Sequence, residues 1–199
     1  ITHELKSPLA SIKLYLQTIL KRQLSKEDFE KYINNTVEDI DRLNDLAEKM
    51  LLASRIDSKS YSFAKQDFNF SETARKIIDK LNSAHFKSLK IESVIDPAVV
   101  YHGDEQALSS VILNLLENSI KYTNGSPSIH FELTKYNDII KLIITDNGIG
   151  IPHHEKEKIF QKFYRVGTED TRTSKGTGLG LFIVKKVLDN HSAQIKVTD

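Results

Sequence analysis

The sequence predicts a helical hairpin followed by an α/β domain, which is built on a mixed sheet with helices on one face. Residues 1–58 contain no glycine and repeat apolar residues at steps of three and four, as amphipathic helices do. Beyond residue 69, stretches of helical periodicity alternate with short strand-like stretches, which indicates an α/β sandwich. We therefore expect a hairpin domain at 1–58, a linker at 59–69 and a second domain at 70–199.

The first domain is predicted to contain two antiparallel helices. The first ends near Leu24, and the second begins at Ser25, which is followed by Asp28 in a pattern typical of a helix start. Because a hairpin alone cannot bury its apolar stripes, pairing with a second copy into a dimeric four-helix bundle is expected. Packing against the second domain of the same chain remains the alternative. The stripes consist of Leu5, Leu9, Ile12, Leu16 and Ile19 in the first helix, and Phe29, Ile33, Thr36, Ile40, Leu43, Ala47 and Met50 in the second.

The second domain is predicted to contain four helices and at least three strands. Helices are expected at 71–83, with Ser71 as N-cap, and at 104–121, 156–160 and 179–190. Strands are expected at 90–95, 128–133 and 139–145, and the short turn at 136–138 makes the last two an antiparallel pair. The linker has room for one short strand. The chain starts within a helical pattern and ends in a strand-like stretch, so we expect an excised fragment lacking upstream residues and the final strands.

The composition excludes several classes of function. Lys and Arg number 28 against 27 Asp and Glu, a net charge of +1, which gives no support to a nucleic-acid or membrane-surface binder. The chain has no cysteine, so disulfides, thiolate metal sites and cysteine nucleophiles are excluded. No apolar run approaches the ~20 residues needed to cross a bilayer.

An acidic turn follows the strand at 139–145. Asp146 leads into Asn147-Gly148-Ile149-Gly150, where the glycines allow the backbone to approach a ligand closely. Because Asp-Asn-Gly is also a frequent turn former, this segment alone is equally consistent with a plain turn.

A glycine-rich stretch, Gly176-Thr177-Gly178-Leu179-Gly180, opens the last helix. Unpaired N–H groups and the helix dipole make such a helix start a good anion cradle. The stretch follows no predicted strand, which argues against a dinucleotide-binding fold, and it lacks the Gly-Lys-Ser/Thr of a P-loop. On its own, a flexible linker remains the alternative.

Three polar residues share one face of the helix at 104–121. Asn114, Asn118 and Lys121 are spaced at i, i+4 and i+7. Amide oxygens suit Mg²⁺, and an ammonium group suits phosphate. Without further context, a solvated polar face is the ordinary explanation of this pattern.

In this order, the segments resemble the motifs of sensor histidine kinases of two-component signalling. Residues 114–122 resemble the N-box, 146–150 the G1 box, 160–164 the F-box and 176–180 the G2 box. Residues 3–8, His-Glu-Leu-Lys-Ser-Pro, resemble the H-box that precedes them. The resemblance covers nearly the whole chain, and the joint occurrence of the motifs overrides the separate alternative explanation of each.

The resemblance implies a Bergerat-type ATP-binding α/β sandwich. Asp146 would accept a hydrogen bond from the adenine amino group, Asn118 with Asn114 would hold Mg²⁺, and Lys121 would approach the phosphates. Residues 153–177 resemble the mobile lid over the nucleotide. The implied ATP-binding set is Asn114, Asn118, Lys121, Tyr122, Asp146, Gly148, Gly150, Ile151, Phe160, Arg165, Gly176, Thr177, Gly178, Leu179 and Gly180. Within this set, Tyr122 offers a ring to the adenine or packs in the core, Phe160 anchors the lid hinge, and Arg165 reaches phosphate.

The resemblance also implies that His3 is the phosphoacceptor. A neutral imidazole is a good nucleophile because its ordinary pKa is about 6.5. Glu4 is the implied general base, and Pro8 is expected to kink the helix below His3. The phosphohistidine would then pass its phosphoryl group to an aspartate of a response regulator docked on the hairpin. The other histidines show no metal-ligand spacing.

The sequence departs from the family pattern at two places. Ser7 stands where many members have Thr or Asn, at a position associated with phosphatase activity toward the regulator, so that activity is left open. Ser192-Ala193 stands where paired glycines are frequent.

A catalytically silent scaffold and another Bergerat-type ATPase are the alternative functions. The family analogy makes the chain the cytoplasmic part of a membrane-anchored bacterial sensor, attached only through an upstream segment.

Overall fold

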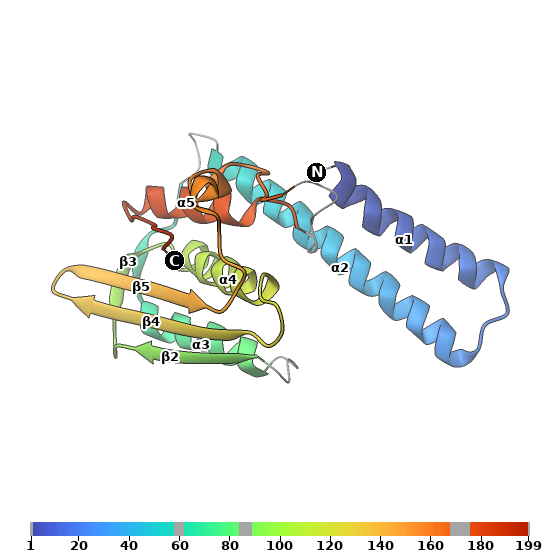
Figure 1. Cartoon of the computed structure of the whole chain (residues 1–199), viewed down its shortest axis with the longest axis horizontal. Coiled ribbons are helices and arrows are strands. Elements are labelled where there is room, and N and C mark those ends of the chain that lie inside the picture. Colours follow the sequence, from blue (N-terminus) through green and yellow to red (C-terminus); the bar gives the residue numbers. More distant parts are fainter. Residues whose placement is uncertain (1, 58–61, 84–88, 168–175, 199) are drawn as a thin grey trace.

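A computed structural model describes residues 2–57, 62–83, 89–167 and 176–198. The hairpin consists of α1 (Thr2–Lys21) and α2 (Lys26–Asp57), which lie side by side and extend away from the second domain (Figure 1). The predicted start of the second helix is present, because the Ser25 hydroxyl accepts the Asp28 N–H at 3.1 Å and donates to the Asp28 carboxylate at 2.8 Å. Tyr15 and Tyr32 stack between the two helices, with ring centroids 5.7 Å apart.

The second domain contains a three-stranded mixed sheet in the order β2-β4-β5. Strand β2 (Lys90–Ile95) is parallel to β4 (Ser128–Tyr136), which is antiparallel to β5 (Ile139–Asp146). A second, two-stranded sheet pairs β1 (Gln66–Asn69) with β3 (Val100–Gly103). Strand β1 lies in the segment that the sequence assigned to the linker.

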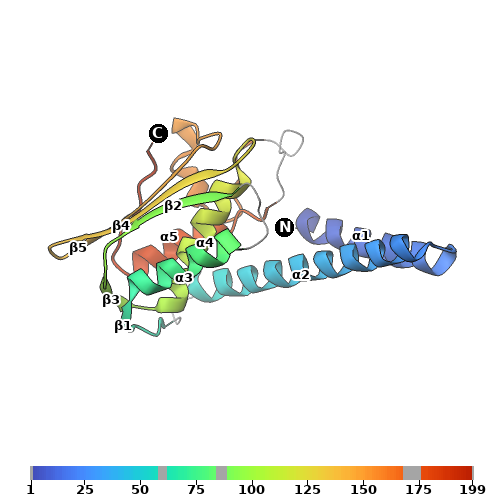
Figure 2. The same ribbon diagram turned by 90° about the horizontal axis from the view of Figure 1, so that it is seen from below.

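Helices α3 (Phe70–Ser83), α4 (Glu105–Lys121) and α5 (Gly180–Asn190) cover one face of the sheet, and the C-terminal end of α2 lies beside α4 and α5 (Figure 2). The core lies between sheet and helices because β4 alternates buried and open positions, turning Ile129, Phe131 and Leu133 inward. From the helices, Ile112, Leu116, Ile183, Val184 and Val187 complete this core. The predicted fold class is therefore confirmed. Within the described residues, no helix has both the length and the apolar character needed to span a membrane.

Several local predictions need correction. Helix α3 is capped by Asn69, whose side-chain oxygen accepts the Glu72 N–H at 3.2 Å. Ser71 is instead fully buried, and its hydroxyl donates to the Asp96 carbonyl and accepts the Val99 N–H. The predicted helix at 156–160 is a pair of 3₁₀ turns, His153–Glu155 and Lys158–Phe160. Strand β3 was missed because four residues carry little periodic signal.

The C-terminal stretch also differs from its prediction. Residues 193–198 form no strand, because they pair with none of the described strands. Helix α5 ends instead in a compact turn in which the Ala193 N–H donates to the Leu188 carbonyl at 2.9 Å. Ser192 adopts the left-handed backbone conformation there, with φ of 54°. Glycine is favoured in this conformation, so Ser192 occupies a position at which glycine would be less strained.

Candidate functional site

Helix α4 carries the polar face that the sequence singled out. It begins at a strong N-cap, because the Asp104 carboxylate accepts the Ala107 N–H at 2.9 Å. Asn114 is buried, and its amide nitrogen donates to the carbonyl and the hydroxyl of Ser110 at 2.8 and 3.2 Å. Asn118 and Lys121 are half-buried on the following turns. The three side chains thus follow one stripe toward the C-terminal end of α4.

The acidic turn after β5 is tied to that same end of α4. One carboxylate oxygen of Asp146 accepts the Gly148 N–H at 2.9 Å, and the other accepts the Ser119 hydroxyl at 2.8 Å. The Ile149 N–H donates to the Tyr122 carbonyl at 3.0 Å. Asp146 itself stays exposed, so its carboxylate is held by the protein on one side and open on the other.

Gly148 is required by this close approach. An added Cβ would stand 2.7 Å from the Asp146 carboxylate and 3.1 Å from the Tyr122 carbonyl oxygen. Tyr122 has 37% of its surface exposed, so it does not belong to the core, and its ring lies 5.0 Å from the Lys121 ammonium. Gly150, with φ of 69°, continues the turn into half-buried Ile151.

The glycine-rich stretch faces the stripe on α4. A Cβ on Gly176 would overlap the Lys121 ammonium, and a Cβ on Gly180 would stand 2.9 Å from the Asn114 side-chain oxygen. The Thr177 hydroxyl accepts the Leu179 N–H at 3.2 Å, and fully buried Leu179 fixes the stretch to the core. The start of α5 therefore lies beside the Asn114–Lys121 stripe, where a cation and helix N–H groups favour an anion.

The segment predicted as a lid packs its first part against this stretch. The Phe163 N–H donates to the Gly178 carbonyl at 2.9 Å, and Tyr164 hydrogen-bonds Glu155. Phe160 and Arg165 are half-buried, and neighbouring Ile159 is buried. The central part of the predicted lid, residues 168–175, lies outside the described residues.

The H-box residues lie in the first turns of α1. The backbone of His3 and Glu4 is helical, and their side chains lie outside the described part of the chain. Ser7 is exposed, and its carbonyl accepts the Ser11 hydroxyl at 3.2 Å. Helix α1 continues through Pro8. The structure therefore describes the helical backbone at His3 and Glu4, but it does not describe how their side chains lie.

The end of α2 is attached to the second domain by ion pairs. The Asp57 carboxylate lies 3.2 Å from the Lys162 ammonium and 3.3 Å from that of Lys186, and these two groups lower the pKa of Asp57. Farther along α2, Lys49 lies 3.5 Å from Glu117 of α4. These exposed ion pairs contribute little by themselves, but they mark where α2 packs on the second domain, and fully buried Ala53 of α2 belongs to the shared core there.

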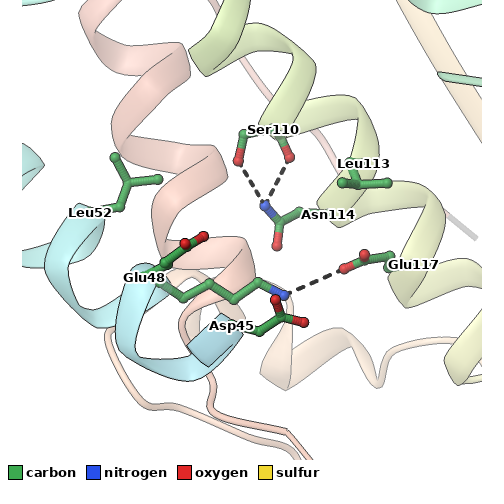
Figure 3. Close-up of a pocket in the computed structure, with 8 residues that line it drawn as sticks. Asp45, Glu48, Leu52, Ser110, Leu113, Asn114 and Glu117 are labelled. Carbon is green, nitrogen blue, oxygen red and sulfur yellow. Dashed lines mark hydrogen bonds and ion pairs between the residues drawn. The ribbon is translucent and has the colours of Figure 1, made fainter. Parts of the chain in front are cut away.

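A pocket of about 360 Å³ lies between α2 and α4, near Asn114 (Figure 3). The Lys49–Glu117 ion pair spans it, and Ser110 together with Asn114 lies on its α4 side. Asn114 thus lies beside both the glycine-rich stretch and this pocket against the hairpin. The lining consists of Asp45, Glu48, Lys49, Leu52, Ser110, Leu113, Asn114 and Glu117.

Ser119 and Asp57 make long-range contacts that the sequence did not predict. Ser119 stands directly after Asn118, but its hydrogen bond reaches Asp146, 27 residues away in the sequence. Asp57 contacts lysines 105 and more residues away. No local pattern marks such pairs, because both depend on the packing of elements that are distant in the chain.

Two family profiles match the chain. Residues 1–59 match the His Kinase A (phospho-acceptor) domain, and residues 103–199 match the histidine kinase-, DNA gyrase B-, and HSP90-like ATPase family. The sensor protein kinase WalK of Staphylococcus haemolyticus is 30% identical over 200 residues, which cover 98% of this chain and 33% of WalK. The chain spans about a third to a half of the length of the curated relatives it matches.

Solved structures resemble the chain across both domains. The histidine kinase AdeS of Acinetobacter baumannii superposes with a TM-score of 0.68 at 21% identity, covering 94% of this chain and 86% of AdeS. The histidine kinase ThkA, solved in complex with the response regulator protein TrrA, gives a TM-score of 0.65 at 23% identity, covering 82% of this chain and 48% of ThkA. At these identities, the likeness concerns the fold.

Proposed function

The chain belongs to the sensor histidine kinases of two-component systems, and from this we infer that it transfers the γ-phosphoryl group of ATP to its own His3. The observation that carries the inference is the convergence at the end of α4. Asp146 is bound there through Ser119, and the glycine-rich stretch faces Lys121. A base-reading carboxylate and a phosphate-binding region thereby lie at two sides of one helix end.

In the proposed complex, Asp146 accepts the adenine amino group, and Gly148 lets the base lie against the backbone. The half-exposed ring of Tyr122 is available to the base. Lys121 and the start of α5 hold the phosphates, because their charge and N–H groups complement anionic oxygens. The proposed pocket is completed by Ile151, Phe160, Arg165 and Leu179, together with Gly150, Gly176, Gly178 and Gly180.

We propose that Asn118, assisted by Asn114, holds Mg²⁺. The Asn114 nitrogen is used by Ser110, which leaves its oxygen directed to the start of α5. Among the described residues, no group of three or more His, Cys, Asp or Glu side chains is arranged to hold a metal. Amide and phosphate oxygens are thus the proposed ligands, a set that Mg²⁺ accepts. When bound, Mg²⁺ supplies positive charge to the β- and γ-phosphates.

The proposed chemical step is an in-line transfer. A ring nitrogen of neutral His3 forms a P–N bond as the bond between the γ-phosphorus and the β,γ-bridging oxygen breaks, and ADP leaves. Glu4 takes the imidazole proton, and Lys121 stabilises charge at the leaving group. The phosphoryl group then passes to a response-regulator aspartate. That partner is supported by ThkA, a protein of the same fold solved with a regulator. The exposed position of Ser7 makes its hydroxyl accessible to a docked regulator.

We propose a homodimer through the hairpin. In the single chain, stripe residues such as Leu9, Phe29 and Ile40 keep 54%, 45% and 44% of their surface exposed. A second hairpin would cover them, because apolar stripes of this kind are usually buried in the core of a helix bundle. We further propose that the chain acts on the cytoplasmic side, where ATP is available, as part of a longer membrane-anchored sensor. The name and greater length of the WalK relatives support this proposal.

The test is incorporation of label from γ-labelled Mg-ATP. Wild-type chain is expected to gain acid-labile, alkali-stable label, and His3→Gln and Asn118→Ala are expected to lose it. His130→Gln and Asn82→Ala change the same residue types at exposed positions outside the site and are expected to keep it. ATP binding without label would favour a silent scaffold. ATP hydrolysis without labelled protein would favour another Bergerat-type ATPase.

A further inference from the structure

Ser119 is the buried residue that connects α4 to the base-reading carboxylate. Only 6% of its surface is exposed, and its hydroxyl donates to the Asp146 Oδ2 atom at 2.8 Å. The Oδ1 atom accepts the Gly148 N–H at 2.9 Å. Each oxygen of this carboxylate therefore accepts one hydrogen bond from the protein. The donor to Oδ2 lies on α4, and the donor to Oδ1 lies in the turn itself.

We propose that Ser119 is a positioning residue that fixes the orientation of Asp146 toward a 6-aminopurine, and that it thereby contributes to the selection of ATP over 6-oxopurine nucleotides. The proposal rests on the proposed function, in which Asp146 reads the base. Ser119 itself is not expected to touch the nucleotide.

The physical reason lies in the freedom of a carboxylate. Rotation about χ2 of an aspartate is broad, and a bond to each oxygen restricts it before the ligand arrives. The free lone pairs of an ionised carboxylate only accept, so they match an amino group and oppose the carbonyl oxygen of guanine. Without the hydroxyl, Oδ2 loses its helix donor, and the carboxylate becomes freer to turn.

Ser119→Ala removes the hydroxyl without removing the local hydrogen bond of the helix backbone. The Ser119 carbonyl accepts the Thr123 hydroxyl at 2.7 Å, and this bond does not involve the Ser119 side chain. Ser119→Ala therefore keeps the local helix contact and removes the link to Asp146. Ser109 is a matched control, because its hydroxyl also lies on α4 and donates at 2.7 Å to a carbonyl, that of Glu105.

The test compares equilibrium dissociation constants for ATP and for purine riboside triphosphate, which lacks the 6-amino group. We expect Ser119→Ala to weaken ATP binding roughly 3- to 10-fold and to change binding of the analogue less than about 2-fold. Ser119→Cys, a weaker donor of similar size, is expected to lie between wild type and Ser119→Ala. Ser109→Ala is expected to leave both constants unchanged. Circular dichroism establishes that each variant is folded.

The outcomes separate the two proposals. An equal loss of affinity for both ligands, or no loss for either, would overturn the role of Ser119. Wild-type chain that binds neither ligand would instead overturn the proposed function. In the wild-type background, Ser119→Ala is expected to weaken binding of ATP only. If Ser119→Ala causes no further loss of ATP affinity in the Asp146→Asn background, Ser119 acts through Asp146.

Discussion

Gly178 offers the most direct test of how the glycine-rich stretch is built. Its φ is 67°, and an added Cβ would stand 2.6 Å from the Phe163 carbonyl carbon and 2.7 Å from the Tyr164 carbonyl oxygen. Both neighbours are backbone atoms, so no side-chain rotation relieves the overlap. Gly178→Ala must therefore displace the first part of the predicted lid or the start of α5.

The expected loss of stability has two parts. A residue with a Cβ costs about 1 kcal/mol in the left-handed conformation. Overlap in a packed region adds about 1–3 kcal/mol. Gly125 is a matched control, because its φ is 93° and nothing lies within 4 Å of an added Cβ. Gly125→Ala is expected to show the first part alone, and the effect of alanine on the unfolded chain is common to both variants.

The assay is urea unfolding followed by circular dichroism, with hydrogen exchange as a local readout. We expect Gly178→Ala to lose about 1–3 kcal/mol more unfolding free energy than Gly125→Ala. The Phe163 N–H, which donates to the Gly178 carbonyl, should exchange faster in Gly178→Ala only. Equal unfolding free energies and unchanged exchange at Phe163 would refute the packing argument.

Three other perturbations follow from the structure. The lysines beside Asp57 lower its pKa below the ordinary value of 3.8, so its ion pairs stabilise the fold above about pH 4 and are lost as the pH falls through the folded-state pKa. The difference in unfolding free energy between wild type and Asp57→Asn should be constant from pH 5 to about 8 and shrink at about pH 3. A difference that persists at about pH 3 would contradict this sign. Ser192→Gly should stabilise the chain by about 0.5–1 kcal/mol in thermal unfolding, because glycine adopts a φ of 54° without strain; a loss of stability would mean that the Ser192 side chain makes a contribution larger than the strain. Chelation of Mg²⁺ by EDTA should abolish labelling of His3 and excess Mg²⁺ should restore it, whereas labelling that continues in EDTA would remove the proposed role of Asn118.

Local patterns were sufficient to predict most elements. The helix cap at Ser25 and the antiparallel pair β4 and β5 depend on residues that are close in the chain, and both are present. Prediction was poorer where tertiary contacts compete with local preference. Ser71 is a good N-cap by type, but burial against the turn after β2 takes its hydroxyl, and Asn69 caps the helix. The short strand β3 depends on β1 as its partner.

The sequence by itself determined the fold class, the order of the motifs and the residue types at the proposed nucleotide site, because periodicity and short motifs are local properties. Only the tertiary structure decided which groups meet. It brought Gly176 beside Lys121 and joined Ser119 to Asp146. It also attached Asp57 to the second domain. Such contacts arise because burial of the shared core fixes the helices relative to the sheet, and the positions of the polar groups follow from that packing.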